Sequence, residues 1–551
     1  RAFWCLCSKN LPVFASLHPD PCFALACLPP CYMLGRWQLL PAYAGSVALV
    51  IGLWSVGVAL ILLAIALLIT APLPVIRGLL GKYSVGVVDF EAEVDGARVI
   101  GRWLYPSQPH QSSALYVALP RAGLTAAFVG TATPPALRRF LPRWVLSHWN
   151  CVAIPAKRGA ALAKSCESMP VVLFSHGLTG TREVSQSLGL TLAAAGALVV
   201  LVEHTDGSST LARSLDGSSL PFDHSLYDLG EDPPTKEYVA ARREQTERRA
   251  AELRRHLTLL RRIHGVAHSR AETYEESLFT AEARGAHFVG ASPSSSSVRL
   301  DGIPAADTAS LLTALGERLD LSRSVVAGHS FGGASALTFA CEEEELPVGK
   351  PPIAVVALDP MVDWVPERVM ARAGYGEHGS YGLQQPPLQR YEKTPPLAEV
   401  PLLLVWSEEW QRLGYFRQWS ANLLERAGRV DPDSGSVSPT GKVSPAGRAQ
   451  WLKRDRSHAC VVVGSGHQAL CDVALLLPGR LNALLKNSLG GARSSELASR
   501  VNAVVLGWLR NQGLLLEGGE TASTWYRGES LPLTRLPGIM RHRSAGTDAR
   551  Y

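Results

Sequence analysis

The most chemically suggestive stretch of this 551-residue sequence sets a serine between two glycines, Gly328-His329-Ser330-Phe331-Gly332. The apolar run before it is typical of a strand, and the run GGASALTFA after it is typical of a helix. A Gly-x-Ser-x-Gly sequence between a strand and a helix is the pattern of a nucleophile elbow, in which glycines allow a strained turn. Ser330 is therefore a candidate nucleophile that still needs a base, an acid and an oxyanion site.

The oxyanion site of such an enzyme takes one backbone N–H from the residue after the nucleophile and one from an earlier loop. The loop FSHGLTG, Phe174 to Gly180, follows an apolar run that suits a strand buried on both faces. We therefore predict that the N–H groups of Leu178 and Phe331 are the two donors. A plain turn between a strand and a helix is the alternative interpretation of this loop.

The base should be a histidine that follows the last strand of the sheet. His467 lies in the Gly/Ser loop GSGHQ, directly after the apolar run CVVV. His458 is the rival, but it precedes that run and would lie at the opposite end of the sheet. We expect structural roles for His176, His204 and His329, in a turn, at a strand end and beneath the elbow.

The acid is the member of the triad that the residues leave most open. Asp359 ends the apolar run AVVAL and Asp363 follows closely, whereas Glu408 and Glu409 end the run LLLVWS. Both positions could face the histidine, and both keep the chain order serine, acid, histidine. Asp359 is favoured because it comes immediately after its strand, where it could orient and stabilise an imidazolium.

These candidate residues all lie where strands and helices alternate along the chain, which predicts an α/β domain with a mostly parallel sheet. YSVGVVDFEAEV and ARVIGRWLYPS are expected to form a strand pair that turns at Asp95-Gly96. We expect the insertions 208–238, 271–303 and 431–447 to form loops. The fold class is therefore α/β, and we expect an N-terminal membrane helix in addition.

The N-terminal region lacks charge between Arg36 and Arg77, and its run from Ser46 to Thr70 is almost entirely apolar. A bilayer core needs roughly 20 apolar residues in a helix, so we predict a transmembrane helix at about 46–70. The predicted organisation is an N-terminal segment over 1–78, a catalytic domain over 79–515 and a partly disordered tail over 516–551.

Composition limits the classes of partner. The formal charge is only +6, and basic residues are scattered among acidic ones, so nucleic-acid binding has little support. The most basic run, Arg242 to Arg262, has leucines at helical spacing and predicts an amphipathic helix with a solvated basic face. None of the ten cysteines forms a Cys-x-x-Cys pair, so a zinc or redox site is unsupported.

Several of these segments together resemble the platelet-activating factor acetylhydrolase family, in its plasma and type II intracellular form. GKYSVGVVDFE, VVLFSHGLTGTRE, GLTLAAAGALVVLVEHTDGSS, REQTERRAAEL, VVAGHSFGGA, ALDPMV, WSEEWQ and GSGHQALCD resemble its segments in order. The resemblance extends over roughly Tyr83 to Leu515. It implies an α/β-hydrolase fold, with Ser330 as nucleophile, Asp359 as acid, His467 as base, and Leu178 and Phe331 as oxyanion donors.

The resemblance also implies an activity, namely calcium-independent hydrolysis of an acetyl, short or oxidised acyl ester at the sn-2 position of a phospholipid. It implies no cofactor, and the expected partner is a phospholipid at a membrane surface. One alternative is a general carboxylesterase on the same fold. A second alternative is a non-catalytic membrane-anchored domain that binds lipid or a protein partner. The residues leave the oligomeric state open.

Overall fold

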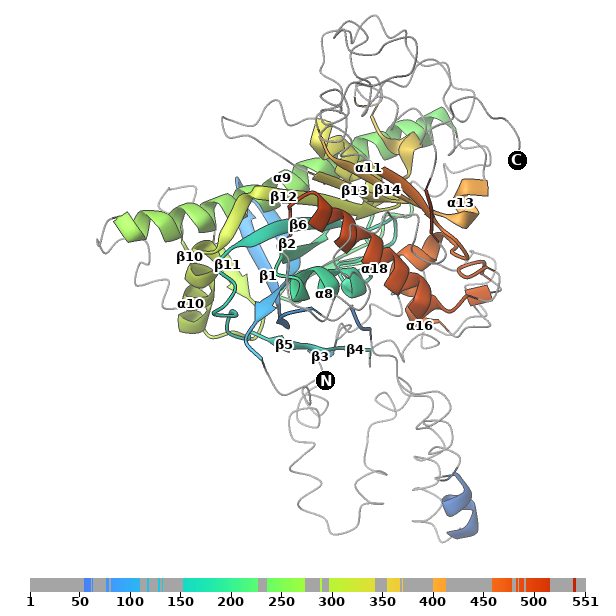
Figure 1. The fold of residues 1–551 in the computed structure, drawn as a ribbon, viewed down its shortest axis with the longest axis horizontal. Coiled ribbons are helices and arrows are strands. Elements are labelled where there is room, and N and C mark those ends of the chain that lie inside the picture. The colour runs from blue at the N-terminus through green and yellow to red at the C-terminus, as the bar shows by residue number, and fades with distance from the viewer. Residues whose placement is uncertain are drawn as a thin grey trace, which may run out of the picture. The chain divides into compact units, whose positions relative to one another are not determined.

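The computed structural model of the chain describes the core of the predicted α/β region and parts of its surroundings (Figure 1). The described residues are 54–60, 62, 76–78, 81–109, 116–117, 127–128, 131, 152–225, 235–272, 288–289, 297–341, 354–366, 369, 400–412, 458–477, 482–483, 485–489, 492–515 and 539–541.

The chain forms two compact units. The first comprises residues 1–76 and 115–154, and the second comprises residues 77–114 and 155–551. In the first unit, β3 (Tyr116–Val117) pairs antiparallel with β4 (Ala153–Ile154). All the predicted site residues lie in the second unit.

The second unit is built on one mixed sheet whose central strands are parallel. The strands follow the order β10-β11-β1-β2-β7-β6-β12-β13-β14-β15-β16, with β5 beside β1. Their bounds are β1 (Ser84–Val94), β2 (Ala97–Ser107), β5 (Ala156–Arg158), β6 (Met169–Ser175), β7 (Leu198–Glu203), β10 (Phe288–Val289), β11 (Ser297–Leu300), β12 (Leu319–His329), β13 (Ala354–Leu358), β14 (Leu402–Ser407), β15 (His458–Val462) and β16 (Ile539–Arg541).

The six strands from β7 to β15 run parallel, and antiparallel pairs join β2 to β7 and β16 to β15. The carboxyl ends of parallel strands meet at one edge of a sheet, so the residues that follow β6, β12, β13, β14 and β15 gather there. Ser330, Asp359 and His467 each follow one of these strands. The predicted alternation of strands and helices is therefore confirmed.

Helices cover both faces of this sheet (Figure 1). α8 and α18 pack together on one face, and α9, α10 and α11 pack together on the other. The described helices have the bounds α8 (Gln186–Ala194), α9 (Lys236–Glu272), α10 (Ala305–Gly316), α11 (Phe331–Cys341), α13 (Glu408–Arg412), α16 (Val473–Leu476) and α18 (Ser494–Asn511), with 3-10 turns η5 (Val362–Trp364) and η9 (His467–Leu470). This mostly parallel mixed sheet between helices is consistent with an α/β hydrolase.

The predicted strand pair at the start of this unit is confirmed. β1 and β2 pair antiparallel over their full lengths, from Ser84 opposite Ser107 to Val94 opposite Ala97. Asp95 and Gly96 adopt φ angles of 52° and 73°. Positive φ at both central residues is the geometry of the two-residue turn that matches the twist of paired strands.

Two predictions about surface segments need correction. Part of the expected loop 208–238 forms a strand pair, β8 (Leu211–Arg213) with β9 (Ser219–Pro221). Within the expected loop 271–303, β11 adds to the sheet beside β1. Within the C-terminal tail, whose partial disorder stays a prediction, β16 pairs with the edge strand β15. The expected loop 431–447 lies outside the described residues.

The predicted transmembrane helix at about 46–70 falls almost entirely outside the described residues. Residues 54–60 within it are helical, and Trp54, Val56 and Val58 expose their side chains. Among the helices that the structure describes, none has the length and apolar character needed to cross a bilayer. The membrane helix therefore stays a prediction.

Candidate active site

Ser330 lies in a sharp turn between β12 and α11, as the Gly-x-Ser-x-Gly pattern predicts. Its φ angle is 58°, a left-handed conformation that is strained for a residue with a side chain. A Cβ at Gly328 would lie 2.1 Å from the Gly332 carbonyl oxygen, and a Cβ at Gly332 would lie 2.0 Å from the Ser175 carbonyl oxygen. Both glycines are therefore required by close backbone contacts, and they hold Ser330 at the carboxyl end of β12.

Asp359 and His467 meet at the same edge of the sheet. The Nδ1 of His467 lies 3.0 Å from Oδ2 of Asp359, so Nδ1–H donates to the carboxylate and leaves Nε2 available as a base. Asp359 is fully buried, with a strained φ of 42°. Ser407 binds the same carboxylate, since its backbone N–H donates to Oδ1 at 2.6 Å and its hydroxyl donates to Oδ2.

Burial shifts the pKa values of both groups. Burial raises the pKa of Asp359 above its usual range, and the two hydrogen bonds from Ser407 act in the opposite direction and favour the carboxylate. Burial lowers the pKa of His467 to about 4, and the Glu409 carboxylate acts in the opposite direction. The low pKa keeps the His467 imidazole neutral near pH 7, which is the form that a general base requires.

The imidazole of His467 packs against two rings. The ring of Trp410 stacks on it in parallel planes, with the centroids 4.0 Å apart. The second ring is that of His329, whose centroid lies 4.6 Å from the centroid of the His467 ring. Nε2–H of His329 also donates to the His467 carbonyl oxygen at 3.1 Å. His329 is the residue before the candidate nucleophile, so it connects the elbow directly to the histidine loop.

The alternative acids have a different role in the structure. Glu408 accepts a hydrogen bond from the Gly464 N–H at 2.7 Å, and Glu409 accepts one from the His467 N–H at 2.8 Å. Both carboxylates therefore hold the backbone of the loop that carries His467, while Asp359 contacts its ring. His458 begins β15 and so lies at the opposite end of that strand from His467.

The predicted oxyanion loop approaches the elbow closely. A Cβ on Gly177 would lie 3.2 Å from the Ser330 Cβ. Thr179 adopts a left-handed φ of 59°, and its N–H donates to the Ser208 carbonyl oxygen at 2.9 Å. Within the described part of the chain, neither the Leu178 N–H nor the Phe331 N–H donates to a protein acceptor. The assignment of these two amides as oxyanion donors stays a prediction.

The structure brings the five predicted residues to one edge of the sheet, but it does not join all of them. No hydrogen bond between Ser330 and His467 occurs among the described residues. Such contacts are often loose in a free enzyme and tighten when substrate binds. Ser330 and His467 are both partly exposed, so a substrate could reach them.

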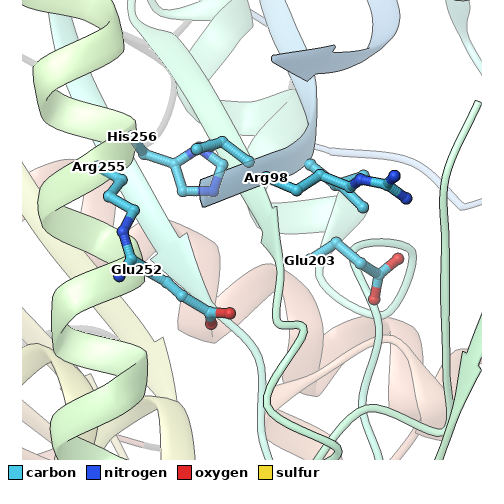
Figure 2. Close-up of a pocket in the computed structure, with 7 residues that line it drawn as sticks. Arg98, Glu203, Glu252, Arg255 and His256 are labelled. Carbon is cyan, nitrogen blue, oxygen red and sulfur yellow. The ribbon is translucent and has the colours of Figure 1, made fainter. Parts of the chain in front are cut away.

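A small pocket lies away from these residues, between α9 and the neighbouring strands (Figure 2). Glu252, Arg255 and His256 line it from α9, and Arg98 and Glu203 line it from β2 and β7. None of the five predicted site residues lines this pocket. In the described ranges, no cluster of His, Cys, Asp and Glu side chains is arranged to hold a metal ion.

Residues 70–278 match the family model "Platelet-activating factor acetylhydrolase, isoform II". The chain is 26% identical to platelet-activating factor acetylhydrolase of Canis lupus familiaris over 288 residues, covering 49% of this chain and 52% of that protein. It is also 26% identical to the Cavia porcellus enzyme over 303 residues, covering 53% and 57%. The resemblance to this family is therefore confirmed.

The chain spans just over half the length of the curated relatives that it matches. A solved structure of ferulic acid esterase from Streptomyces cinnamoneus aligns with 86% of this chain and 100% of its own, at 17% identity and a TM-score of 0.43.

Sequence reasoning did not assign functions to Ser407 and Trp410, which contact the acid and the base. Both lie in the stretch WSEEW, beside the two glutamates that were the alternative candidates for the acid. A hydroxyl and an aromatic ring at the end of the strand beside the acid are the signal that could have identified them.

Proposed function

We propose that this chain is a calcium-independent serine hydrolase that cleaves an acetyl, short or oxidised acyl ester at the sn-2 position of phospholipids. The observation that carries the proposal is the hydrogen bond between Asp359 and His467, at the sheet edge where Ser330 occupies a strained elbow. The family match and this arrangement support a hydrolase that acts on esters, and the names of the relatives support the phospholipid substrate.

Acylation begins with attack of Ser330 Oγ on the ester carbonyl carbon, while its proton moves to Nε2 of His467. The carbonyl oxygen becomes an oxyanion, which accepts hydrogen bonds from the N–H groups of Leu178 and Phe331. Asp359 stabilises the imidazolium through Nδ1–H without taking its proton. The ester bond then breaks, and the lysophospholipid oxygen leaves with the proton from Nε2.

Deacylation repeats these steps with water. Nε2 of His467 accepts a proton from a water molecule, which attacks the acyl carbon bound to Ser330. The same two N–H groups hold the second oxyanion, and Ser330 Oγ leaves with the proton from the imidazolium. The products are the carboxylic acid and the free serine. No step requires a metal ion, so addition of a chelator should leave the rate unchanged.

The first test compares hydrolysis of 1-alkyl-2-acetylglycerophosphocholine with hydrolysis of p-nitrophenyl acetate by the full-length chain. We expect Ser330→Ala and His467→Ala to lower kcat at least about a thousandfold, because the triad acts as a unit. His458→Ala is the matched control, since that residue starts the strand that His467 follows, and it should keep wild-type activity.

Two results would separate the proposal from its alternatives. If simple esters are hydrolysed and the phospholipid is not, the chain is a general carboxylesterase. If the wild-type chain hydrolyses neither substrate and does not react with a fluorophosphonate, the non-catalytic alternative holds. Full activity in either alanine variant would remove the corresponding residue from the mechanism.

We also propose that the N-terminal apolar segment anchors the chain to a membrane, as a single span at about 46–70. Such an anchor would bring the site close to phospholipid. Flotation of the full-length chain with phospholipid vesicles, before and after extraction with alkaline carbonate, tests this directly. Release of the chain by carbonate alone would contradict a spanning helix.

A further inference from the structure

Helix α9 carries a fully buried arginine that contacts the oxyanion loop. Nη1 of Arg249 donates to the His176 carbonyl oxygen at 2.7 Å, and Nη2 lies 3.5 Å from the Gly177 carbonyl oxygen. These carbonyls belong to the peptide units immediately before Leu178, whose N–H is a proposed oxyanion donor. The guanidinium therefore fixes the backbone that orients this N–H group.

The same guanidinium contacts the other side of the oxyanion site. It lies over the ring of Phe331, with its carbon 4.2 Å from the ring centroid. Phe331 is fully buried, and its N–H is the second proposed donor. A cation over an aromatic face is attracted by the ring quadrupole, and burial strengthens the attraction. Arg249 thus contacts the loop that carries the Leu178 N–H and also the residue Phe331, which together supply the two proposed oxyanion donors.

The guanidinium of Arg249 also forms hydrogen bonds and an ion pair with the loop after β7. Nε and Nη2 donate to the Ser208 hydroxyl oxygen at 2.9 and 2.6 Å. The Asp206 carboxylate lies 3.3 Å from Nε and balances the buried charge. Only the planar fork of arginine can direct donors at a carbonyl and a hydroxyl while its face covers a ring, and the lysine ammonium cannot.

A second contact from α9, one turn further along, reaches the strand before the loop. The Glu252 carboxylate accepts a hydrogen bond from Nδ1 of His204 at 2.5 Å, and Nε2 of His204 lies 2.7 Å from the Ser175 hydroxyl. Figure 2 shows Glu252 leaving α9 toward the strands. Ser175 has no exposed surface, so this chain of hydrogen bonds is structural. It holds the residue whose carbonyl Gly332 contacts.

We propose that Arg249 is a positioning residue that sets the relative placement of the two oxyanion donors, Leu178 N–H and Phe331 N–H. This inference rests on the proposed function, because it assigns the arginine to the transition state of that reaction. Loss of Arg249 should therefore lower kcat and weaken the binding of inhibitors that mimic the tetrahedral intermediate, while substrate binding is little changed.

The test measures kcat and KM for p-nitrophenyl acetate and inhibition by a trifluoromethyl ketone, whose serine adduct carries an oxyanion. For Arg249→Met we expect kcat to fall roughly tenfold to hundredfold, as for small misplacements of catalytic groups, with KM within about threefold. The inhibition constant should rise by the same factor as kcat falls. Arg249→Lys should recover only part of the loss.

Arg242→Met is the matched control, because Arg242 is equally buried on α9 and also lies over an aromatic ring, that of Trp364, but donates to Gln245 of its own helix instead of to the oxyanion loop. It should lose a similar amount of thermal stability while kcat stays near the wild-type value. Equal losses of kcat in the two methionine variants, or a folded Arg249→Met with unchanged kcat, would overturn the inference.

Ser208→Ala covers the case in which Arg249→Met does not fold. This substitution removes the hydroxyl that accepts hydrogen bonds from two N–H groups of Arg249, but it keeps the charge of the arginine. We expect kcat to fall less than in Arg249→Met, with a parallel rise of the inhibition constant. An unchanged kcat in Ser208→Ala would also contradict the inference.

The wild-type chain distinguishes failure of the proposed function from failure of this inference. A wild-type chain that neither turns over ester nor reacts with a fluorophosphonate overturns the proposed function itself. An active wild type with unaffected variants overturns the Arg249 role alone.

Discussion

At the scale of single residues, the site is defined by strained backbone at three places. Thr179, Ser330 and Asp359 all adopt left-handed φ angles without being glycine. Each such conformation costs on the order of 1–3 kcal/mol and persists only where its surroundings determine it. The three residues supply the oxyanion loop, the proposed nucleophile and the proposed acid, so the strain is concentrated where the proposed chemistry needs fixed geometry.

Glu409 offers a test of the charge around the proposed base. Burial lowers the pKa of His467 to about 4 and the Glu409 carboxylate raises it, so Glu409→Gln should lower this pKa further. The acid limb of kcat/KM reports the base of the free enzyme. We therefore expect the acid limb of kcat/KM to lie below pH 6.5 in the wild type and at still lower pH in Glu409→Gln. A pH–rate profile on p-nitrophenyl acetate measures both limbs.

Glu408→Gln is the control for this profile, because that neighbouring carboxylate accepts a hydrogen bond from the Gly464 N–H, whereas Glu409 accepts one from the N–H of His467 itself. Its acid limb should match the wild type. A limb that moves to higher pH in Glu409→Gln would contradict the assignment of His467 as the titrating base.

At the scale of elements, the elbow depends on how closely α11 approaches the end of β6. A Cβ on Gly332 would lie 2.0 Å from the Ser175 carbonyl oxygen, and backbone cannot yield as a flexible side chain can. We expect Gly332→Ala to lower the free energy of unfolding by about 1–3 kcal/mol, as for other overpacked sites, and to abolish ester hydrolysis. Urea denaturation and the p-nitrophenyl acetate assay measure the two effects.

Gly265→Ala is the matched control within α9. A Cβ at Gly265 would meet no atom within 4 Å, and alanine favours helix over glycine by roughly 1 kcal/mol. This variant should therefore be slightly more stable than the wild type and fully active. If Gly332→Ala behaved in the same way, the close contact between the elbow and β6 would be wrong.

Sequence patterns predicted the elements that carry the proposed triad and the helix α9 with its buried leucines, but they did not predict that two arginines of α9 are buried. The strands before Ser330, Asp359 and His467 are short apolar runs that end at polar residues. Such runs are local in the sequence, so they can be recognised without the fold. The basic face of α9 was predicted to be solvated, but Arg242 and Arg249 are buried. Their partners lie far away in sequence, and only the packed fold brings those partners to the helix.

The acid shows the same limit at closer range. The residues favoured Asp359 without excluding Glu408, because both follow neighbouring parallel strands. The structure distinguishes them by direction, since Asp359 contacts the imidazole and Glu408 contacts a backbone N–H. Such a difference depends on side-chain orientation at the strand ends, and spacing along the chain does not encode it.

At the scale of the whole molecule, buried histidines couple folding to pH. His256 is buried beside the ring of Phe90, and burial lowers its pKa to about 3, so the fold holds it neutral. The unfolded chain takes up this proton near pH 6.5, so stability is lost as pH falls from about 6.5 toward 3. The loss from one such group is about 1.4 kcal/mol per pH unit.

We expect His256→Leu to remove this part of the acid sensitivity. The difference in unfolding free energy between wild type and variant should therefore change in favour of the variant as pH falls from 7 to 4.5. Urea denaturation at several pH values measures both curves. Parallel curves over that range would show that His256 does not titrate on unfolding.

The pairing of β16 with β15 has a consequence for how pieces of this protein can be produced. β15 leads directly to the loop that carries His467, and β16 satisfies the backbone groups along its outer side. Cutting the chain after residue 515 would remove β16 and leave a row of free donors and acceptors beside that loop. Open strand edges invite pairing with other molecules, so a shortened product is prone to self-association. A purification tag is for the same reason better placed away from residues 539–541.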